Sequence, residues 1–255
     1  MKVAELFGHR TEHPLSLATD FIAGLECEIE SVRSKKGIGR FVPTEDGSLR
    51  NEGCEFISEP LDKPTLVQEF HNLHATITYY DKDKAFSPRT STHVHVNCRS
   101  LDEKQVRTIV LLYALYEEFF FAMVEPSRRG NIHCVPLTET FLCNYYGHNL
   151  SSMIQRWHKY TALNMLPLGK LGTLEFRHLQ GTDDTNLMES WLTSLENLWK
   201  LGQEVEITEA NLSSETVLRD WFGKLFGHSS RIMALEPCLF DMISNSLIDV
   251  KLSLV

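Results

Sequence analysis

The segment DFIAGLECEIESV, residues 20–32, places carboxylates at three successive alternate positions, 26, 28 and 30. Alternate residues of a β-strand point to opposite faces, so Glu26, Glu28 and Glu30 would share one face at intervals of about 6–7 Å. Leu25 and Cys27 would share the other face. The segment therefore predicts a strand that packs one apolar face in the core and gathers acids on the other.

Three later segments repeat this arrangement. A solvated strand face is commonly polar, but such faces usually carry Lys, Thr, Ser and mixed charges. Here the polar positions hold residue types that bind metal ions. They are Glu55 in GCEFISEP, His93, His95 and Asn97 in THVHVN, and Glu175 with Arg177 in TLEFRHL.

The choice of ligand types favours a hard cation. Two carboxylates about 7 Å apart repel by about 0.6 kcal/mol in water and by several-fold more in a partly desolvated cleft. Such a cluster either raises carboxyl pKa values or binds cations. Carboxylates with one or two imidazoles suit Mg²⁺ or Mn²⁺, whereas zinc sites use more His or Cys.

Carboxylate-held Mg²⁺ beside arginine indicates the handling of phosphate. The arginines of SRRGN, Arg128 and Arg129, offer forked donors in a loop. The glycines of KKGIGR do not form a standard phosphate-binding motif.

The order of elements predicts an α+β fold with a mostly antiparallel sheet. Strands are expected at the four segments above and at KYTALNML, with a Gly-rich turn after it. Helices are expected at residues 64–80, 102–124, 150–160 and 184–202, and residues 33–52 are expected to form a loop. Residues 1–205 would form the main domain, and 206–255 a helical extension packed on it.

Composition limits the classes of binding partner and the cellular location that we expect for the protein. The chain has 255 residues and a net charge of −9, which argues against a nucleic-acid-binding surface. No stretch approaches the ~20 apolar residues of a membrane span, and the first residues lack the apolar region of a signal peptide. The six cysteines, Cys143 among them, are scattered without a CxxC pair, so we expect reduced thiols and a cytoplasmic location.

Seven short motifs then give a resemblance. In order along the chain they are GLECEIE, EDGSL, GCEFISEPL, STHVHVN, SRRGNIHC, KYTALNML and GTLEFRHLQGT. The set resembles the amidoligase family, carboxylate–amine ligases related to glutamine synthetase and glutamate–cysteine ligase, over roughly residues 20–200. The resemblance implies a glutamine-synthetase-like curved sheet with helices on its convex side, and ATP with two or three Mg²⁺ or Mn²⁺ ions on its concave face.

The resemblance also implies a reaction. A substrate carboxylate attacks the γ-phosphate of ATP to give an acyl phosphate and ADP, and an amine then displaces phosphate to form an amide. The acid and the amine would be small molecules, amino acids or peptides. The sequence leaves their identity and the oligomeric state open.

The resemblance implies roles for the residues at the matching motif positions of this chain. The implied metal ligands are Glu26, Glu28, Glu55, His95 and Glu175. Catalytic roles fall to Arg177, Asp46 and Arg128, and contacts to ATP to His95, Arg129, Lys159 and Arg177. Asp46 would shape the substrate or amine site, although an Asp-Gly turn explains it equally simply. The roles of Glu30, Glu59 and His93 stay open.

Two other functions fit part of the pattern. A metal-dependent hydrolase of amide or ester bonds would explain the ligands, but not the paired acidic strand and ExR strand. A catalytically silent module that binds a nucleotide or peptide would keep the fold. Such a module would have no physical reason to maintain mutually repelling carboxylates.

Overall fold

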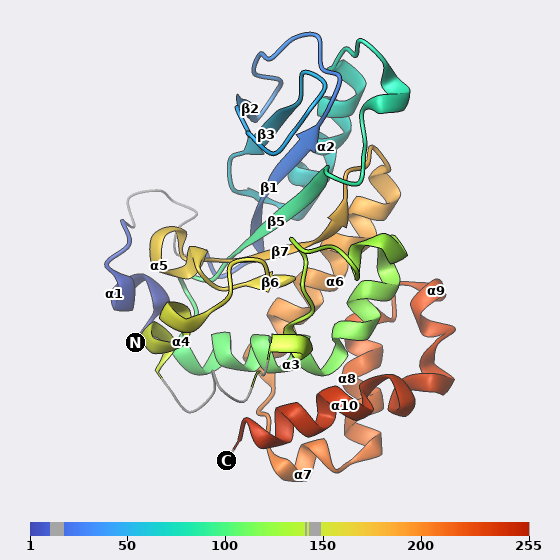
Figure 1. Cartoon of the computed structure of the whole chain (residues 1–255). Coiled ribbons are helices and arrows are strands. Elements are labelled where there is room, and N and C mark those ends of the chain that lie inside the picture. Colours follow the sequence, from blue (N-terminus) through green and yellow to red (C-terminus); the bar gives the residue numbers. More distant parts are fainter. Residues whose placement is uncertain (11–17, 141, 143–148, 255) are drawn as a thin grey trace.

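The structure is a computed structural model that describes residues 1–10, 18–140, 142 and 149–254. Cys143 lies outside the described residues. The predicted α+β class is confirmed, since the chain combines helices with one seven-stranded sheet (Figure 1). The sheet has the order β2-β3-β1-β5-β7-β6, with β4 paired to β1. Its strands are β1 (Ile22–Ile29), β2 (Phe41–Thr44), β3 (Cys54–Ser58), β4 (Leu61–Asp62), β5 (Ser91–Asn97), β6 (Leu163–Asn164) and β7 (Thr173–Gln180).

Every pairing between these strands is antiparallel, as predicted. The register places Glu26 opposite His93, Glu28 opposite Glu55, and His95 opposite Glu175. Residues directly opposite each other in a ladder project to the same face. The register therefore collects the polar residues of four strands on one side of the sheet.

The other side of the sheet forms the core. Leu25, Cys27, Val94 and Phe176 are almost completely buried there. Helices α2 and α6 lie behind β1, β5 and β7 in Figure 1, and the ring of Tyr113 on α3 packs edge-on against Phe176. The helices are α1 (Val3–Phe7), α2 (Lys63–Thr76), α3 (Glu103–Met123), α4 (Leu150–Arg156), α5 (Pro167–Leu171), α6 (Thr185–Glu204), α7 (Glu209–Leu212), α8 (Glu215–Phe226), α9 (Ser230–Met233) and α10 (Leu239–Leu252).

Local sequence explains where the long helices begin. Asp102 accepts a hydrogen bond from the backbone N–H of Gln105 and caps α3, and the Gln105 side chain accepts from the Asp102 N–H. Asp184 caps α6 in the same manner through the N–H groups of Asn186 and Leu187. Each cap satisfies donors that have no partner within the helix.

Three local predictions were wrong. Residues 33–52 contain the edge strand β2, where Phe41 is buried against the sheet while Pro43 lacks the N–H that an inner strand would need. The expected turn after KYTALNML holds the short helix α5, and the strand there shrinks to Leu163–Asn164. Helix α2 ends at Thr76 because Ile77 adopts an extended conformation.

The C-terminal helices pack on the long helices of the core. The Tyr116 hydroxyl of α3 donates to the carbonyl of Leu218 on α8. The Ser246 hydroxyl of α10 donates to the carbonyl of Leu115 on α3. Residues 206–254 are therefore helical and packed on the same core, whereas a domain boundary at residue 205 stays a prediction. In the described part of the chain, we find no helix with the length and apolar character needed to cross a membrane.

A single buried carboxylate lies on α3, on the helical side of the sheet. Glu117 accepts four hydrogen bonds: from the Tyr113 hydroxyl, from the N–H of Leu137, and from the N–H and hydroxyl of Thr138. The Tyr113 hydroxyl also lies 2.8 Å from Nε2 of His178 on β7. Burial raises the pKa of Glu117, although its donors oppose the shift. This carboxylate is satisfied by protein donors alone.

Candidate metal centre

A first cluster of ligand types forms where β1, β5 and β7 lie side by side. Glu26, His93 and Glu175 each offer one ligand atom, and these atoms lie within 4.8 Å of one another. Nδ1 of His93 is 3.4 Å from Oε2 of Glu26 and 3.3 Å from Oε1 of Glu175. The cluster is mostly shielded from water, because His93 and Glu175 are buried and Glu26 is half-buried.

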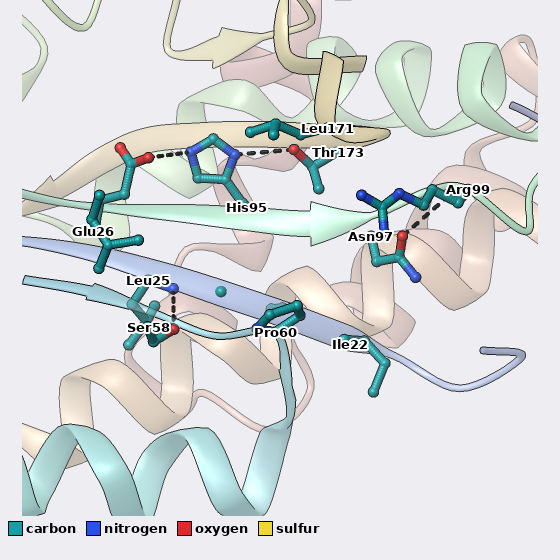
Figure 2. A pocket seen from close by; sticks show the side chains of 13 residues that line it. Ile22, Leu25, Glu26, Ser58, Pro60, His95, Asn97, Arg99, Leu171 and Thr173 are labelled. Carbon is teal, nitrogen blue, oxygen red and sulfur yellow. Dashed lines mark hydrogen bonds and ion pairs between the residues drawn. The ribbon is translucent and has the colours of Figure 1, made fainter. Parts of the chain in front are cut away.

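His95 borders this cluster on the same face. Its Nε2 lies 3.1 Å from Oε1 of Glu26, and its Nδ1 lies 3.0 Å from the hydroxyl of Thr173. Figure 2 shows the imidazole between these two partners. The side chain is therefore fixed with one edge toward the carboxylate.

Glu175 has two further partners. The Asn164 amide donates to its Oε2 at 2.6 Å, and the guanidinium of Arg177 pairs with its Oε1. Arg177 is held in turn by a 3.0 Å bond from its Nε to the carbonyl of His133. A guanidinium fixed in this way sits directly beside the first cluster.

A second cluster contains only carboxylates. Glu28 on β1, Glu55 on β3 and Asp46 on the loop after β2 also bring one oxygen each within 4.8 Å of the others. Asp46 accepts a bond from the Ser48 N–H, which turns the loop at this point. Asp46 therefore both stabilises the Asp-Gly turn and contributes a carboxylate to the second cluster.

The electrostatics of the two clusters differ. Burial and the neighbouring carboxylates Glu26, Glu28 and Asp46 raise the pKa of Glu55 to about 8. Burial also works against ionisation of Glu26, but the contacts to His93 and His95 outweigh it and hold its pKa well below its usual range. Each pair of ionised acids at this separation would repel by about 3–4 kcal/mol at an effective dielectric constant of about 20, and the raised pKa of Glu55 relieves part of this repulsion.

The donor set fits hard divalent cations. The second cluster offers oxygen atoms alone, and the first adds one imidazole nitrogen to two carboxylates. Oxygen-rich sets with an occasional imidazole suit Mg²⁺ and Mn²⁺. A cation in either cluster would also convert its repulsion into attraction. We therefore take Glu26, His93 and Glu175 as one candidate ion site, and Glu28, Asp46 and Glu55 as the other.

A cavity of about 220 Å³ adjoins the first cluster. Glu26 and His95 lie at one end of it, and Asn97 and Arg99 at the other (Figure 2). Gly24 is part of its wall, and a methyl group there would make ordinary van der Waals contact with the Ser58 carbonyl at 3.7 Å. Its remaining walls are mostly apolar and include Ile22, Ile57, Pro60 and Leu171. The cavity can accept a largely apolar group from a ligand whose charged part lies at the first cluster.

Arg128 lies close to the clusters but is buried. Its Nε donates to the carbonyl of His178 at 2.9 Å, and one terminal nitrogen donates to the carbonyl of Arg177 at 2.7 Å. It therefore caps the edge of β7 beyond the end of β6. Its predicted catalytic role stays a prediction, and its observed partners are backbone carbonyls.

The two remaining basic side chains that were predicted to contact ATP have partners elsewhere. Arg129 pairs with Glu118 of α3 at 2.6 Å and stacks over the ring of Phe121. Lys159 is exposed, with its ammonium over the ring of Tyr160. Their contacts to ATP stay predictions.

The structure places the undecided acids. Glu30 is fully buried and accepts bonds from the Arg50 N–H and the Asn51 amide, so it anchors the loop that carries Asp46. Glu59 is exposed and pairs with Arg40 at 3.0 Å. Neither belongs to the two clusters described here.

Sequence reasoning missed one residue that touches both clusters. Ser91 begins β5 and lies within hydrogen-bond distance of Glu28 and His93. Its position two residues before His93 puts it on the same strand face, so extension of the alternation would have found it.

The chain matches no protein-family model, and no curated protein matches it. The geometry of the site is therefore the ground for a function.

Proposed function

We propose that the protein is an ATP-dependent carboxylate–amine ligase that uses two or three Mg²⁺ or Mn²⁺ ions. One observation carries the proposal: two clusters of carboxylates share one sheet face, and a fixed arginine stands beside one of them. Ions in the two clusters would neutralise a triphosphate. Arg177 would contact the phosphoryl group in transfer, where a preorganised charge is most effective.

Each part of the site has a role in this proposal. Glu26, His93 and Glu175 hold one ion, and Glu28, Asp46 and Glu55 hold another. The bound nucleotide supplies the phosphoryl group that activates the substrate carboxylate for attack by an amine. The largely apolar cavity beside His95 seats the base, and Thr173 keeps the imidazole turned toward Glu26.

The glutamine-synthetase-like form of the sheet belongs to the same proposal. The antiparallel order and the helices behind one face agree with it. The remaining partners are an acid and an amine of the amino-acid or peptide class, and a cytoplasmic location supplies ATP. The net charge of −9 argues against nucleic acid as a further partner.

The deciding experiment measures turnover. The protein is incubated with ATP, Mg²⁺ and pools of amino acids and peptides, and ADP and new amide masses are followed. We expect ADP release that requires both an acid and an amine. Glu175→Gln should reduce this turnover at least 100-fold, because it weakens one ion site and removes the partner of Arg177.

Glu59→Gln is the matched control, because this acid is exposed, pairs with Arg40 and lies apart from both clusters. It should retain full turnover. ATP-free cleavage of an ester or peptide without ADP formation would overturn the proposal in favour of a metal-dependent hydrolase, which the paired ion sites also suit. Nucleotide binding without any amine-dependent ADP would favour a silent binding module.

A further inference from the structure

Ser91 connects the two candidate ion sites. Its hydroxyl lies 2.7 Å from Oε2 of Glu28 and 2.8 Å from Nε2 of His93. Its backbone N–H donates to the same oxygen of Glu28 at 2.7 Å. All three residues are buried. The bonds therefore link Glu28, Ser91 and His93 in a row that is shielded from solvent. Its two ends, Glu28 and His93, are candidate ligands of different ions.

The chemistry of a hydroxyl fixes the direction of this chain. A hydroxyl has one hydrogen to donate, and an ionised carboxylate can only accept. If the hydrogen goes to Glu28, the Ser91 oxygen must accept from Nε2 of His93. That nitrogen then carries a ring hydrogen, so Nδ1 is the nitrogen whose lone pair is available to an ion.

The lone pair on Nδ1 points at a place where a cation would fit. Nδ1 lies 3.4 Å from a Glu26 oxygen and 3.3 Å from a Glu175 oxygen. Without an ion this nitrogen lies within hydrogen-bond distance of Glu26, and a shared divalent ion would attract the lone pair and both carboxylates. Metal-bound imidazoles almost always donate their other ring N–H to a fixed acceptor, and here that acceptor is Ser91.

We propose that Ser91 is a positioning residue that selects the Nε2–H tautomer of His93 and so makes Nδ1 a metal ligand. Through its second bond it also orients Glu28, a ligand of the other ion. This inference rests on the proposed function, because it concerns the ion sites named there. Ser91 would then couple the two ion sites, because a change in the orientation of Glu28 would alter the hydrogen bond that Ser91 makes with His93.

Two measurements test the inference. The first is calorimetric titration of the full-length protein with Mn²⁺ alone. The second is ¹⁵N NMR of the histidine rings in metal-free protein, with His93 assigned by its absence from His93→Gln. Three variants are compared with wild type: Ser91→Ala, Ser91→Thr, which keeps a hydroxyl, and Ser246→Ala.

We expect Ser91→Ala to lose the Nε2–H signature of His93 and to weaken Mn²⁺ binding by about 10- to 100-fold, the usual effect of removing a partner of a metal ligand. Ser91→Thr should restore both properties. Ser246→Ala is the control, because its buried hydroxyl bonds only backbone carbonyls of Leu115 and Ile243. It should change neither.

The outcomes separate the inference from the function. Turnover and Mn²⁺ affinity within twofold of wild type in Ser91→Ala, with the tautomer unchanged, would overturn the inference alone. Failure of the wild-type protein to bind Mn²⁺ would overturn the proposed function and the inference together. A loss of the tautomer that the threonine variant does not restore would also count against the assigned role of the hydroxyl.

Discussion

Shielded acids lie on opposite sides of one sheet, and their surroundings differ. On the helical side, Glu117 has four protein donors for its two oxygens. On the polar side, Glu28, Asp46 and Glu55 face one another at less than 4.8 Å. The helical side stores a carboxylate as a structural acceptor. The polar side gathers carboxylates whose few protein donors, Ser91 at Glu28 and Ser48 at Asp46, leave their mutual repulsion in place.

The comparison gives a physical rule for this molecule. A buried charge is costly unless hydrogen bonds or an opposite charge offset its loss of hydration. Where protein donors supply the offset, removing the acid should damage the fold. Where they do not, removing the acid should damage ligand binding and leave the fold intact or more stable. Substitutions on the two sides separate these outcomes.

The largest expected effect is on the helical side. Glu117→Gln should lower the free energy of unfolding by about 2–4 kcal/mol, because an amide turns N–H groups toward buried donors such as the Thr138 N–H. Urea unfolding followed by circular dichroism measures this. Glu118→Gln is the control, since that partly exposed acid pairs with Arg129 at the surface and should cost at most about 1 kcal/mol. Equal stability of the two variants would remove the contrast between the two sides.

The next effect has the opposite sign. Glu55→Gln should raise the unfolding free energy of the metal-free protein by about 1 kcal/mol, a value discounted for the partial exposure of this acid. Excess Mg²⁺ should reverse the order, because wild type gains about 2.7 kcal/mol at 100 times its dissociation constant and the variant gains less. Thermal unfolding with and without Mg²⁺ is the measurement. Destabilisation of the metal-free variant would make Glu55 a structural residue like Glu117.

A third effect depends on pH and concerns two histidines on the helical side. Burial lowers the pKa of His178 to about 3 and that of His74 to about 4. The unfolded chain takes up these protons near pH 6.5, and the folded chain does so only at lower pH. Their contribution to stability is therefore present above pH 6.5 and is lost as pH falls toward 4, at up to about 1.4 kcal/mol per pH unit for each ring.

His74→Leu tests this contribution directly. Both ring nitrogens of His74 are buried without hydrogen-bond partners among the residues that the structure describes, and the ring packs between Phe70 and Phe86. Leucine should raise the unfolding free energy at pH 5 by about 1 kcal/mol and flatten the pH dependence of stability between pH 6.5 and 4. The unfolding free energy at each pH is measured by urea unfolding. If it depends on pH in the variant as it does in wild type, His74 is protonated in the folded protein across this range.

Much of the fold was predictable because its signals are periodic and local. Helices α3 and α6 follow from apolar spacing behind capping aspartates, Asp102 and Asp184. Strand β2 was missed because Phe41 to Thr44 is short, contains a proline and lies among glycines and charges. Its place in the sheet is decided by pairing with β3, which a local pattern does not encode.

The candidate site divides along the same line. The acids and histidines on strands were predictable as a group, because parity along a strand assigns a face and antiparallel neighbours bring faces together. Arg128 and Arg129 were not, because a loop has no period. The sequence made them equivalent, yet one caps the backbone of β7 and the other pairs on the surface of α3.

The strand order also bears on how the chain assembles. Strands β1 to β4 lie within residues 22–62, whereas residues 98–172 separate β5 from its partner β7. Closing the longer separation costs more chain entropy, so the pairing of β5 with β7 belongs to the later part of folding. Glu28 and Glu55 can therefore meet while the chain is still only partly folded. We therefore expect Glu175 to join the first candidate ion site last, and a cation bound there would slow the opening of the finished sheet.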